Sequence, residues 1–212
     1  MAEGKRRLME AALRQAREKG STRGLVLREL AREAGLNHNT FYRHFAGLES
    51  MFQAIIADFS HELRDGLRAA RESVPPGQTP SRVVMGWMLD FAHQRPEVFV
   101  VAIRELYGPP GPVREAIQVV SELMMDDMVR ELTQLGHLPP LARAPWRRLL
   151  RVYATSTFNL CLEYLETPSR RAELIDEAEE LFEVLMAGAQ ARETRRRAAR
   201  PRRTKRTPSV TR

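Results

Sequence analysis

Apolar residues recur along this chain with the spacing of one helix face, and no segment alternates in the manner of a strand. Periodic segments span residues 8–16 and 27–34, and Gly35 after the second supplies the left-handed conformation that often ends a helix. Asn37 suits the N-cap of a short third helix. A much longer segment covers residues 48–73. The pattern therefore predicts three short helices followed by one long helix.

Breaks rich in proline and glycine divide the rest of the chain into further amphipathic segments. The breaks read VPPGQTP at 74–80, RP at 95–96, YGPPGP at 107–112, GHLPPLARAP at 136–145 and TPS at 167–169. From about residue 192 apolar residues become rare, so the basic end is expected to be disordered. The predicted organisation is all-α with about nine helices: a three-helix domain over 1–47, a larger helical domain over 48–191 and a disordered basic tail over 192–212.

Composition narrows the class of protein. The 212 residues are 43% hydrophobic, which suits a globular chain of one or two domains. No run free of charged residues exceeds eleven, whereas a membrane span needs about 18. The start MAEGKRRLME has no apolar signal core, and the lone Cys161 cannot form an internal disulfide. We expect a cytoplasmic protein without a membrane segment.

Charge is concentrated at the two ends. Residues 192–212 hold ten Lys or Arg and one Glu, net +9, and residues 1–50 hold ten and six, net +4. Because the whole chain carries +7, the middle carries −6. Basic ends predict a polyanionic partner, and the acidic middle predicts that this partner does not cover the whole molecule.

Residues 25–45 have the features of a helix-turn-helix. Ala31 is small where the second helix would cross the first, Gly35 permits a tight turn, and Leu36 can plug that turn. Phe41 would anchor the second helix inward. Such a helix lies in the major groove of DNA and reads base edges with its first turns.

The outer face of that helix is rich in hydrogen-bonding groups. Asn39 can contact adenine and Thr40 can meet a thymine methyl group, whereas Tyr42, Arg43 and His44 suit phosphates. The predicted face consists of His38, Asn39, Thr40, Tyr42, Arg43 and His44. A capped helical hairpin inside an ordinary bundle would share the cap and the glycine, and it remains the structural alternative.

The stretch LMEAALRQAREKG followed by LRELAREAGLNHNTFYRHFAGLESMF resembles the N-terminal domain of TetR-type transcriptional regulators over residues 7–56. The resemblance implies a homodimeric repressor whose larger domain binds a small effector and joins the dimer through its last two helices. It places Asn37 to His44 in the recognition helix, and Thr22 and Arg23 at a phosphate-contacting position. Where the family often has a phosphate-binding lysine, this chain has Leu48 and Glu49.

The stretch LNHNTFYRHFAGLES is also similar to the branch of the family that senses acyl-CoA and controls unsaturated fatty-acid synthesis. That resemblance implies a long-chain acyl-CoA as effector; other hydrophobic small molecules or drugs are the alternative ligand class. No bound cofactor or metal is expected, because the histidines lack metal-ligand spacing.

An apolar effector needs an apolar cavity with a few polar groups at its mouth. Methionine adapts to different chain shapes, and Arg104 could meet an anionic head group. The predicted lining residues are Trp87, Met88, Phe91, Phe99, Ile103, Arg104, Tyr107, Met124, Met128, Phe158 and Leu162. Each of them, taken singly, is equally typical of an ordinary core.

Two other functions stay open at this stage. A DNA-coating architectural protein would need only the basic ends of the chain. An enzyme is not expected, because no glycine-rich phosphate loop and no nucleophile elbow occur in the sequence. The faces expected to form the dimer are those of Ala154, Ser156, Leu160, Leu181 and Leu185.

Overall fold

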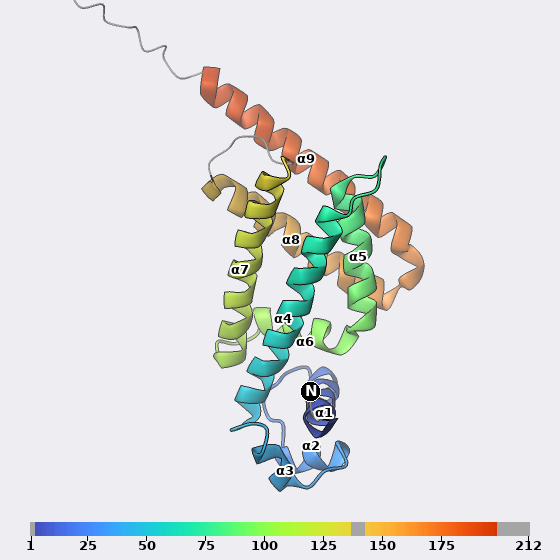
Figure 1. Ribbon diagram of the computed structural model, residues 1–212, viewed down its shortest axis with the longest axis vertical. Coiled ribbons are helices and arrows are strands. Elements are labelled where there is room, and N and C mark those ends of the chain that lie inside the picture. Colours follow the sequence, from blue (N-terminus) through green and yellow to red (C-terminus); the bar gives the residue numbers. More distant parts are fainter. Residues whose placement is uncertain (1–2, 137–142, 199–212) are drawn as a thin grey trace, which may run out of the picture.

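The computed structural model describes residues 3–136 and 143–198, and over these ranges the ordered elements are all helical (Figure 1). The elements are α1 (Glu3–Lys19), α2 (Leu27–Glu33), α3 (His38–Tyr42), α4 (Leu48–Glu72), α5 (Pro80–Gln94), α6 (Pro96–Tyr107), α7 (Pro112–Gln134), α8 (Arg143–Glu166), η1 (Pro168–Arg170) and α9 (Arg171–Ala198). The predicted all-α class is confirmed for the described residues.

Prolines open the middle helices as the sequence suggests. Pro80, Pro96 and Pro112 occupy the first positions of α5, α6 and α7. Proline fits there because the first helical amide has no partner within the helix and the ring fixes a helical φ. Thr79 caps α5, since its side chain accepts a hydrogen bond from the backbone N–H of Arg82 at 3.4 Å. These breaks orient successive helices of the larger domain.

Two large hydrophobic cores lie one above the other along the molecule, beside a small third cluster of Ile56, Ala102 and Ile117. The smaller core joins α1, α2, α3 and the first turns of α4, around Leu8, Phe41 and Phe52. The larger core joins α4, α5, α7, α8 and α9. Figure 1 shows α1 to α3 at one end of the molecule and α4 running from there into the larger domain. The long α4 is thus shared by both parts.

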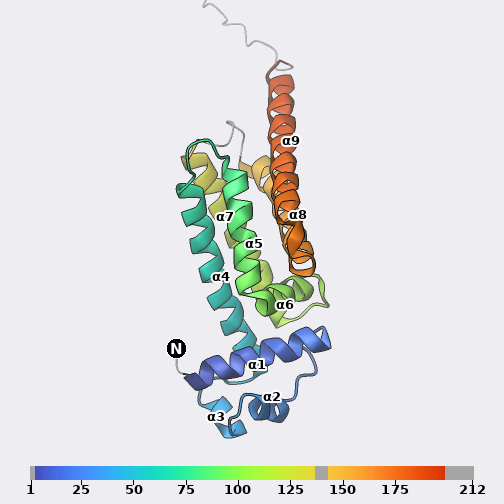
Figure 2. The ribbon, with the colours of Figure 1, turned by 90° about the vertical axis from the view of Figure 1, so that its right-hand side faces the viewer.

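Helix α6 also contacts both parts. Its Val98 and Val101 belong to the smaller core, whereas Phe99 belongs to the larger one. In Figure 2, α6 lies directly above α1, between the small domain and the rest of the molecule. A displacement of α6 would therefore change the packing against α1.

The basic end of the chain differs from its prediction. Helix α9 continues to Ala198, so residues 192–198 are helical rather than disordered. This segment, RETRRRA, is mainly arginine, which is a good helix former and extends a helix already begun. Residues 199–212 of the predicted tail lie outside the described residues.

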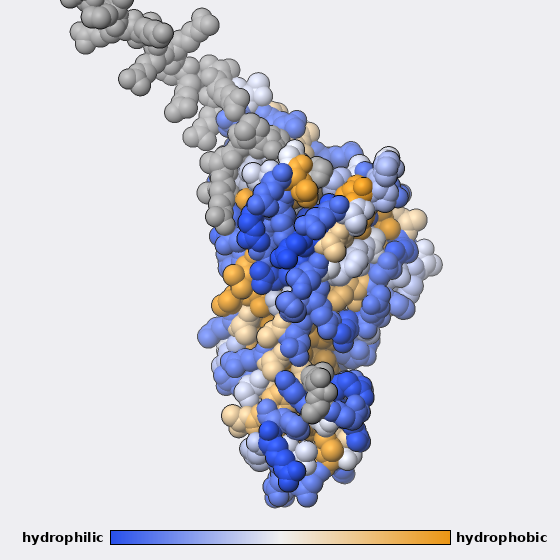
Figure 3. Space-filling view, in the orientation of Figure 1, coloured by the Kyte–Doolittle hydropathy of each residue, from blue (hydrophilic) through white to orange (hydrophobic). Residues whose placement is uncertain are grey.

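The visible face in Figure 3 is mostly hydrophilic, with apolar residues gathered along α7. On that helix Val119 is 61% exposed and Leu123 is 44% exposed. None of the helices in the described ranges combines the length and apolarity that a bilayer crossing requires.

Candidate nucleic-acid interface and ligand cavity

The turn between α2 and α3 is closed by backbone hydrogen bonds. Leu36 N–H donates to the Ala31 carbonyl at 2.9 Å, and Gly35 N–H donates to the Arg32 carbonyl at 3.0 Å. These two hydrogen bonds form a Schellman motif, which needs a residue in the left-handed backbone conformation. Gly35 provides it, with φ 64°. The side chain of Ala31 is only 1% exposed. The predicted helix-turn-helix geometry is therefore present.

Helix α3 is fixed at its start and along its inner face. The Asn37 side chain caps it by accepting a hydrogen bond from the Asn39 N–H at 2.9 Å. Phe41 is fully buried, and its ring lies 5.5 Å from the ring of Phe45. One anchor and one cap thus set which way the remaining side chains of α3 face.

The predicted DNA-contacting residues of this helix fall on its outer side. Tyr42 is 62% exposed and Thr40 is half-buried. Exposed side chains are also found at Asn37, His38, Asn39 and Arg43. His44 is also half-buried and lies beside the start of α1; a Cβ added at Gly4 would lie 3.6 Å from its Nε2.

Thr22 and Arg23 lie elsewhere, against the larger domain. The backbone N–H of Thr22 donates to Glu105 Oε1 at 2.7 Å, and Thr22 itself is buried. The Arg23 guanidinium donates to the backbone carbonyls of Pro109 and Pro110. In this arrangement the Thr22 backbone and the Arg23 side chain serve the contact between the domains rather than the face of α3.

Further contacts extend this link between α1 and α6. Glu105 is 6% exposed and also accepts a hydrogen bond from the Ser21 hydroxyl at 3.1 Å. Arg17 pairs with Glu97 at 3.2 Å, and Arg104 donates to the Arg17 carbonyl at 3.1 Å. The end of α1 is therefore held to α6 by buried and exposed polar contacts together.

An apolar cavity of about 40 Å³ lies between α4, α6, α7 and α8. Its walls are Ile56, Phe59, Leu63, Phe99, Ala102, Ile103, Leu106, Ile117, Val120, Ser121, Met124 and Phe158. Ser121 is the one polar residue among them, and its hydroxyl already donates to the Ile117 carbonyl at 2.9 Å. The cavity can therefore receive apolar groups but offers almost no polar recognition.

The predicted lining residues divide into three groups. Phe99, Ile103, Met124 and Phe158 line this cavity. The neighbouring core contains Met88, Phe91, Met128, Leu162 and Trp87, whose ring stacks on Phe91 at 5.0 Å. Arg104 and Tyr107 lie away from it: Arg104 faces α1, and Tyr107 is 63% exposed. Placing an anionic head group at Arg104 is therefore wrong for this structure, because helix periodicity turns that residue away from the cavity.

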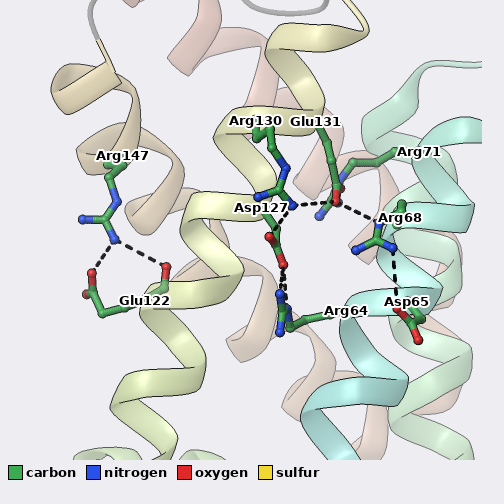
Figure 4. Close-up of polar contacts among 9 residues, drawn as sticks. All are labelled: Arg64, Asp65, Arg68, Arg71, Glu122, Asp127, Arg130, Glu131 and Arg147. Atoms are coloured by element: carbon green, nitrogen blue, oxygen red, sulfur yellow. Dashed lines mark hydrogen bonds and ion pairs between the residues drawn. The ribbon is translucent and has the colours of Figure 1, made fainter.

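A partly buried ionic cluster between α4 and α7 was missed by the sequence analysis (Figure 4). Arg64 pairs with Asp127 at 2.5 Å, and Arg68 pairs with Glu131 at 3.3 Å. Glu131 also pairs with Arg71, which is only 4% exposed. The arginines recur at the i, i+4, i+7 spacing of one helix face, which was the available signal.

The cluster shifts the ionisation of its members. Burial would raise the pKa of Asp127, but hydrogen bonds from Arg64 and Arg130 outweigh it and hold the pKa below its usual value. Burial lowers the pKa of Arg71, and the charge of Glu131 opposes that change. Asp127 is therefore ionised at neutral pH, and the arginines that pair with it favour that form.

Comparison with known proteins agrees with the geometry of the small domain. Residues 8–55 match the family model described as bacterial regulatory proteins, tetR family. Among solved structures, a tetR family transcription regulator from a Shewanella species has a TM-score of 0.67 at 17% identity, over 89% of this chain and 98% of that one.

Two similar structures are regulators called FadR. The fatty acid degradation regulator FadR from Bacillus halodurans has a TM-score of 0.70 at 14% identity, over 89% of this chain and 97% of that one. FadR from Bacillus subtilis, solved with stearoyl-CoA, has a TM-score of 0.66 at 14% identity, over 86% and 97%. Residues 8–55 thus resemble the N-terminal domain of tetR family proteins, and the described chain has the two-part helical fold of these structures.

Proposed function

We propose that this chain is a sequence-specific DNA-binding transcriptional repressor that acts as a homodimer on a palindromic operator and responds to an apolar effector. The observation that carries the proposal is the helix-turn-helix, with a buried anchor at Phe41 and exposed hydrogen-bonding groups at Asn39 and Arg43. A helix held in this way can enter a major groove without rearranging.

In this proposal the side chains of α3 make two kinds of contact with DNA. Asn39 and Thr40 lie in its first turns and contact base edges, and Tyr42 and Arg43 contact phosphates. His38 and the capping Asn37 lie at the approach to the groove. The link from Arg23 to Pro109 and Pro110 makes Thr22 and Arg23 secondary candidates, since a phosphate contact by Arg23 would require that link to open.

Dimerisation through α8 and α9 is supported by what those helices leave exposed. Val152 on α8 is 54% exposed and Val184 on α9 is 62% exposed. Ala154 and Leu160, in contrast, are buried in the core of their own domain, so they do not form the proposed interface. A second copy covering α8 and α9 would bury the exposed valines and set two copies of α3 on successive major grooves, about 34–36 Å apart.

The effector class follows from the apolar cavity and from the similar structures. A cavity with apolar walls suits an aliphatic chain, and the Bacillus subtilis protein of similar fold was solved with stearoyl-CoA. We infer a long-chain acyl compound, such as an acyl-CoA, as effector; other hydrophobic molecules would fit the same walls. Such a ligand shifts DNA binding only by its different affinity for the two states of the protein.

Helix α6 offers the route from cavity to DNA. Phe99, Ala102 and Ile103 line the cavity on one side of α6, while Glu105 holds the turn after α1 on the other.

Replacing Glu105 with alanine removes the acceptor for the Ser21 hydroxyl and the Thr22 N–H. We expect a loss of about 1–3 kcal/mol in the free energy of unfolding, measured in urea.

The control for this change is Glu18→Ala, which removes an exposed carboxylate near the end of α1 that has no hydrogen bond to α6. It should leave the unfolding free energy within about 0.5 kcal/mol of the parent. Equal losses in the two variants would show that the Glu105 contacts do not hold the domains together.

The basic tail adds non-specific attraction to DNA in this account. Removing residues 199–212 deletes six Lys or Arg and should weaken binding to unrelated DNA. The slope of log K against log salt should decrease by up to about five, since each phosphate contact contributes about 0.9. Fluorescence anisotropy at several salt concentrations measures this, and loss of the sequence preference itself would contradict the role given to α3.

Selection from randomised duplex DNA separates the regulator from an architectural protein. A regulator enriches one palindromic sequence, whereas a DNA-coating protein enriches none because it recognises charge alone. Repeating the selection with saturated and unsaturated acyl-CoA identifies the sign of the effector's action. Enrichment of unrelated sequences in every round would favour the architectural alternative.

A further inference from the structure

The basic side chains of the small domain divide into paired and unpaired ones. The ion pairs are Arg6 with Glu3 and Glu10, Arg14 with Glu33, Arg17 with Glu97, and Lys19 with Glu29. Within the described residues no acid pairs with Lys5, Arg7, Arg28, Arg32 and Arg43. Arg43 already has a place in the proposed function, whereas Lys5 and Arg7 belong to α1, a helix without an assigned DNA contact.

The first turn of α1 lies across both ends of α3. A Cβ added at Gly4 would lie 3.6 Å from Nε2 of His44 and 3.7 Å from Cδ1 of Leu36. Leu36 precedes α3 and His44 follows it. Because α3 is only five residues long, about 7.5 Å, one turn of α1 can contact both of its ends. Figure 2 shows the start of α1 directly above α3.

Lys5 is held beside the end of α3 by an aromatic ring. Its Nζ lies 5.7 Å from the centroid of the Phe45 ring, and Phe45 is itself buried. Attraction to the face of a ring orients an ammonium group without neutralising its charge. The segment 44–49, HFAGLE, has no lysine or arginine of its own. Lys5 therefore supplies the cation at the point where α3 leads into α4.

Arg7 lies at the opposite end of α3, over the turn that leads into it. A side chain added at Gly35 would collide with the Arg7 guanidinium. Arg7 is exposed, and no hydrogen bond from its side chain is found in the described part of the chain. Its guanidinium therefore keeps its charge and its donors free at the start of α3.

The acids near these two cations leave an excess of positive charge. Glu3 and Glu10 both bind Arg6, each at 2.6 Å, so the acids in the first turns of α1 are compensated. Glu49, in the first turn of α4, is exposed and unpaired among the described residues. The unpaired cations of α1 and α3 are three, so the excess beside α3 is two.

We propose that Lys5 and Arg7 bind DNA phosphates on the two sides of α3, so that α1 forms part of the DNA interface. The major groove that admits a helix is about 12 Å wide and is bordered by both phosphate backbones. Cations at the two ends of a helix in that groove meet phosphates rather than base edges, and they fix the position of the helix without reading sequence. This inference rests on the proposed function and adds two residues to its interface.

Fluorescence anisotropy of the full chain on the selected palindrome and on a scrambled duplex tests the proposal. Lys5→Gln and Arg7→Gln should each weaken both duplexes by the same factor and reduce the salt slope by about one per protomer. Lys5→Arg keeps the charge and should bind like the parent. The matched controls Lys19→Gln and Arg14→Gln remove the same charge from paired positions farther along α1 and should leave the slope unchanged.

Chemical labelling of the unaltered chain gives a second readout, because its three lysines are Lys5, Lys19 and Lys205. Acetylation by an N-hydroxysuccinimide ester, followed by mass spectrometry, should slow at Lys5 at least about fivefold when either duplex is added, since a phosphate contact shields the amine. Lys19 should react at nearly its original rate.

A parent salt slope in either glutamine variant, an equal change of slope in the controls, or equal protection of Lys5 and Lys19 would overturn the proposal. Absence of any sequence preference in the parent chain would count against the proposed function instead. The two failures are therefore distinguishable, because the first concerns salt dependence on any duplex and the second concerns nucleotide order.

Discussion

Replacing Asn39 with alanine is expected to reduce affinity for the selected operator by roughly ten- to a hundredfold, which corresponds to about 1–3 kcal/mol for a base-specific contact. Asn39 lies in the first turn of α3 with an exposed side chain, and its backbone N–H is held by the cap at Asn37. Affinity for scrambled DNA should hardly change, because Asn39 contributes no charge. Thr40→Ala should follow the same pattern with a smaller loss.

Arg43→Ala is the matched contrast. Arg43 is exposed at the end of α3, where a phosphate contact is expected. Its removal should weaken operator and scrambled DNA about equally and reduce the salt slope by about one. Gel shifts on both duplexes at several salt concentrations measure these quantities. If Asn39→Ala, Thr40→Ala and Arg43→Ala all lost the same factor on both duplexes, the division between base and phosphate contacts would be rejected.

Glu131→Leu is expected to destabilise the larger domain by about 3–5 kcal/mol. The change leaves Arg71, which is 4% exposed, without its carboxylate partner inside the core. A buried charge without a partner costs far more than the pair contributes, because neither water nor a counter-charge replaces the lost contact. Urea unfolding followed by circular dichroism measures the effect.

The double variant Arg71→Met/Glu131→Leu separates this explanation from a simple loss of packing. Removing both charges should restore most of the lost stability, since two apolar side chains of similar size can fill the space. A double variant as unstable as Glu131→Leu alone would contradict the electrostatic account. The same cluster gives a pH dependence: the pKa of Asp127 is lowered in the folded protein, so its contribution is present above about pH 4 and is lost as the pH falls further.

The helices and the helix-turn-helix of α2 and α3 could be predicted because local sequence signals determine them. Glycine at position 35 and the asparagine cap at position 37 fix the turn and the start of α3, and first-turn prolines fix α5 to α7. These signals act over four or five residues, so the sequence alone reveals them. The inward Phe41 then determines which side chains of α3 remain free.

Contacts between distant helices could not be predicted in the same way. Arg104 was placed at a ligand and instead donates to α1, and Ala154 and Leu160 were placed in a dimer interface and instead pack inward. Each is a choice between two faces of a helix, and apolar periodicity does not say which neighbour covers a face. The partners of Arg71 likewise lie 60 residues away along the chain.

The central claim is that α3 recognises nucleotide order. It is tested most directly by competition between the selected palindrome and a scrambled duplex of the same length and composition, at physiological salt. The account predicts that the intact, folded chain prefers the palindrome by at least about a thousandfold. Equal affinity for the two duplexes, with the helix-turn-helix folded, would contradict it.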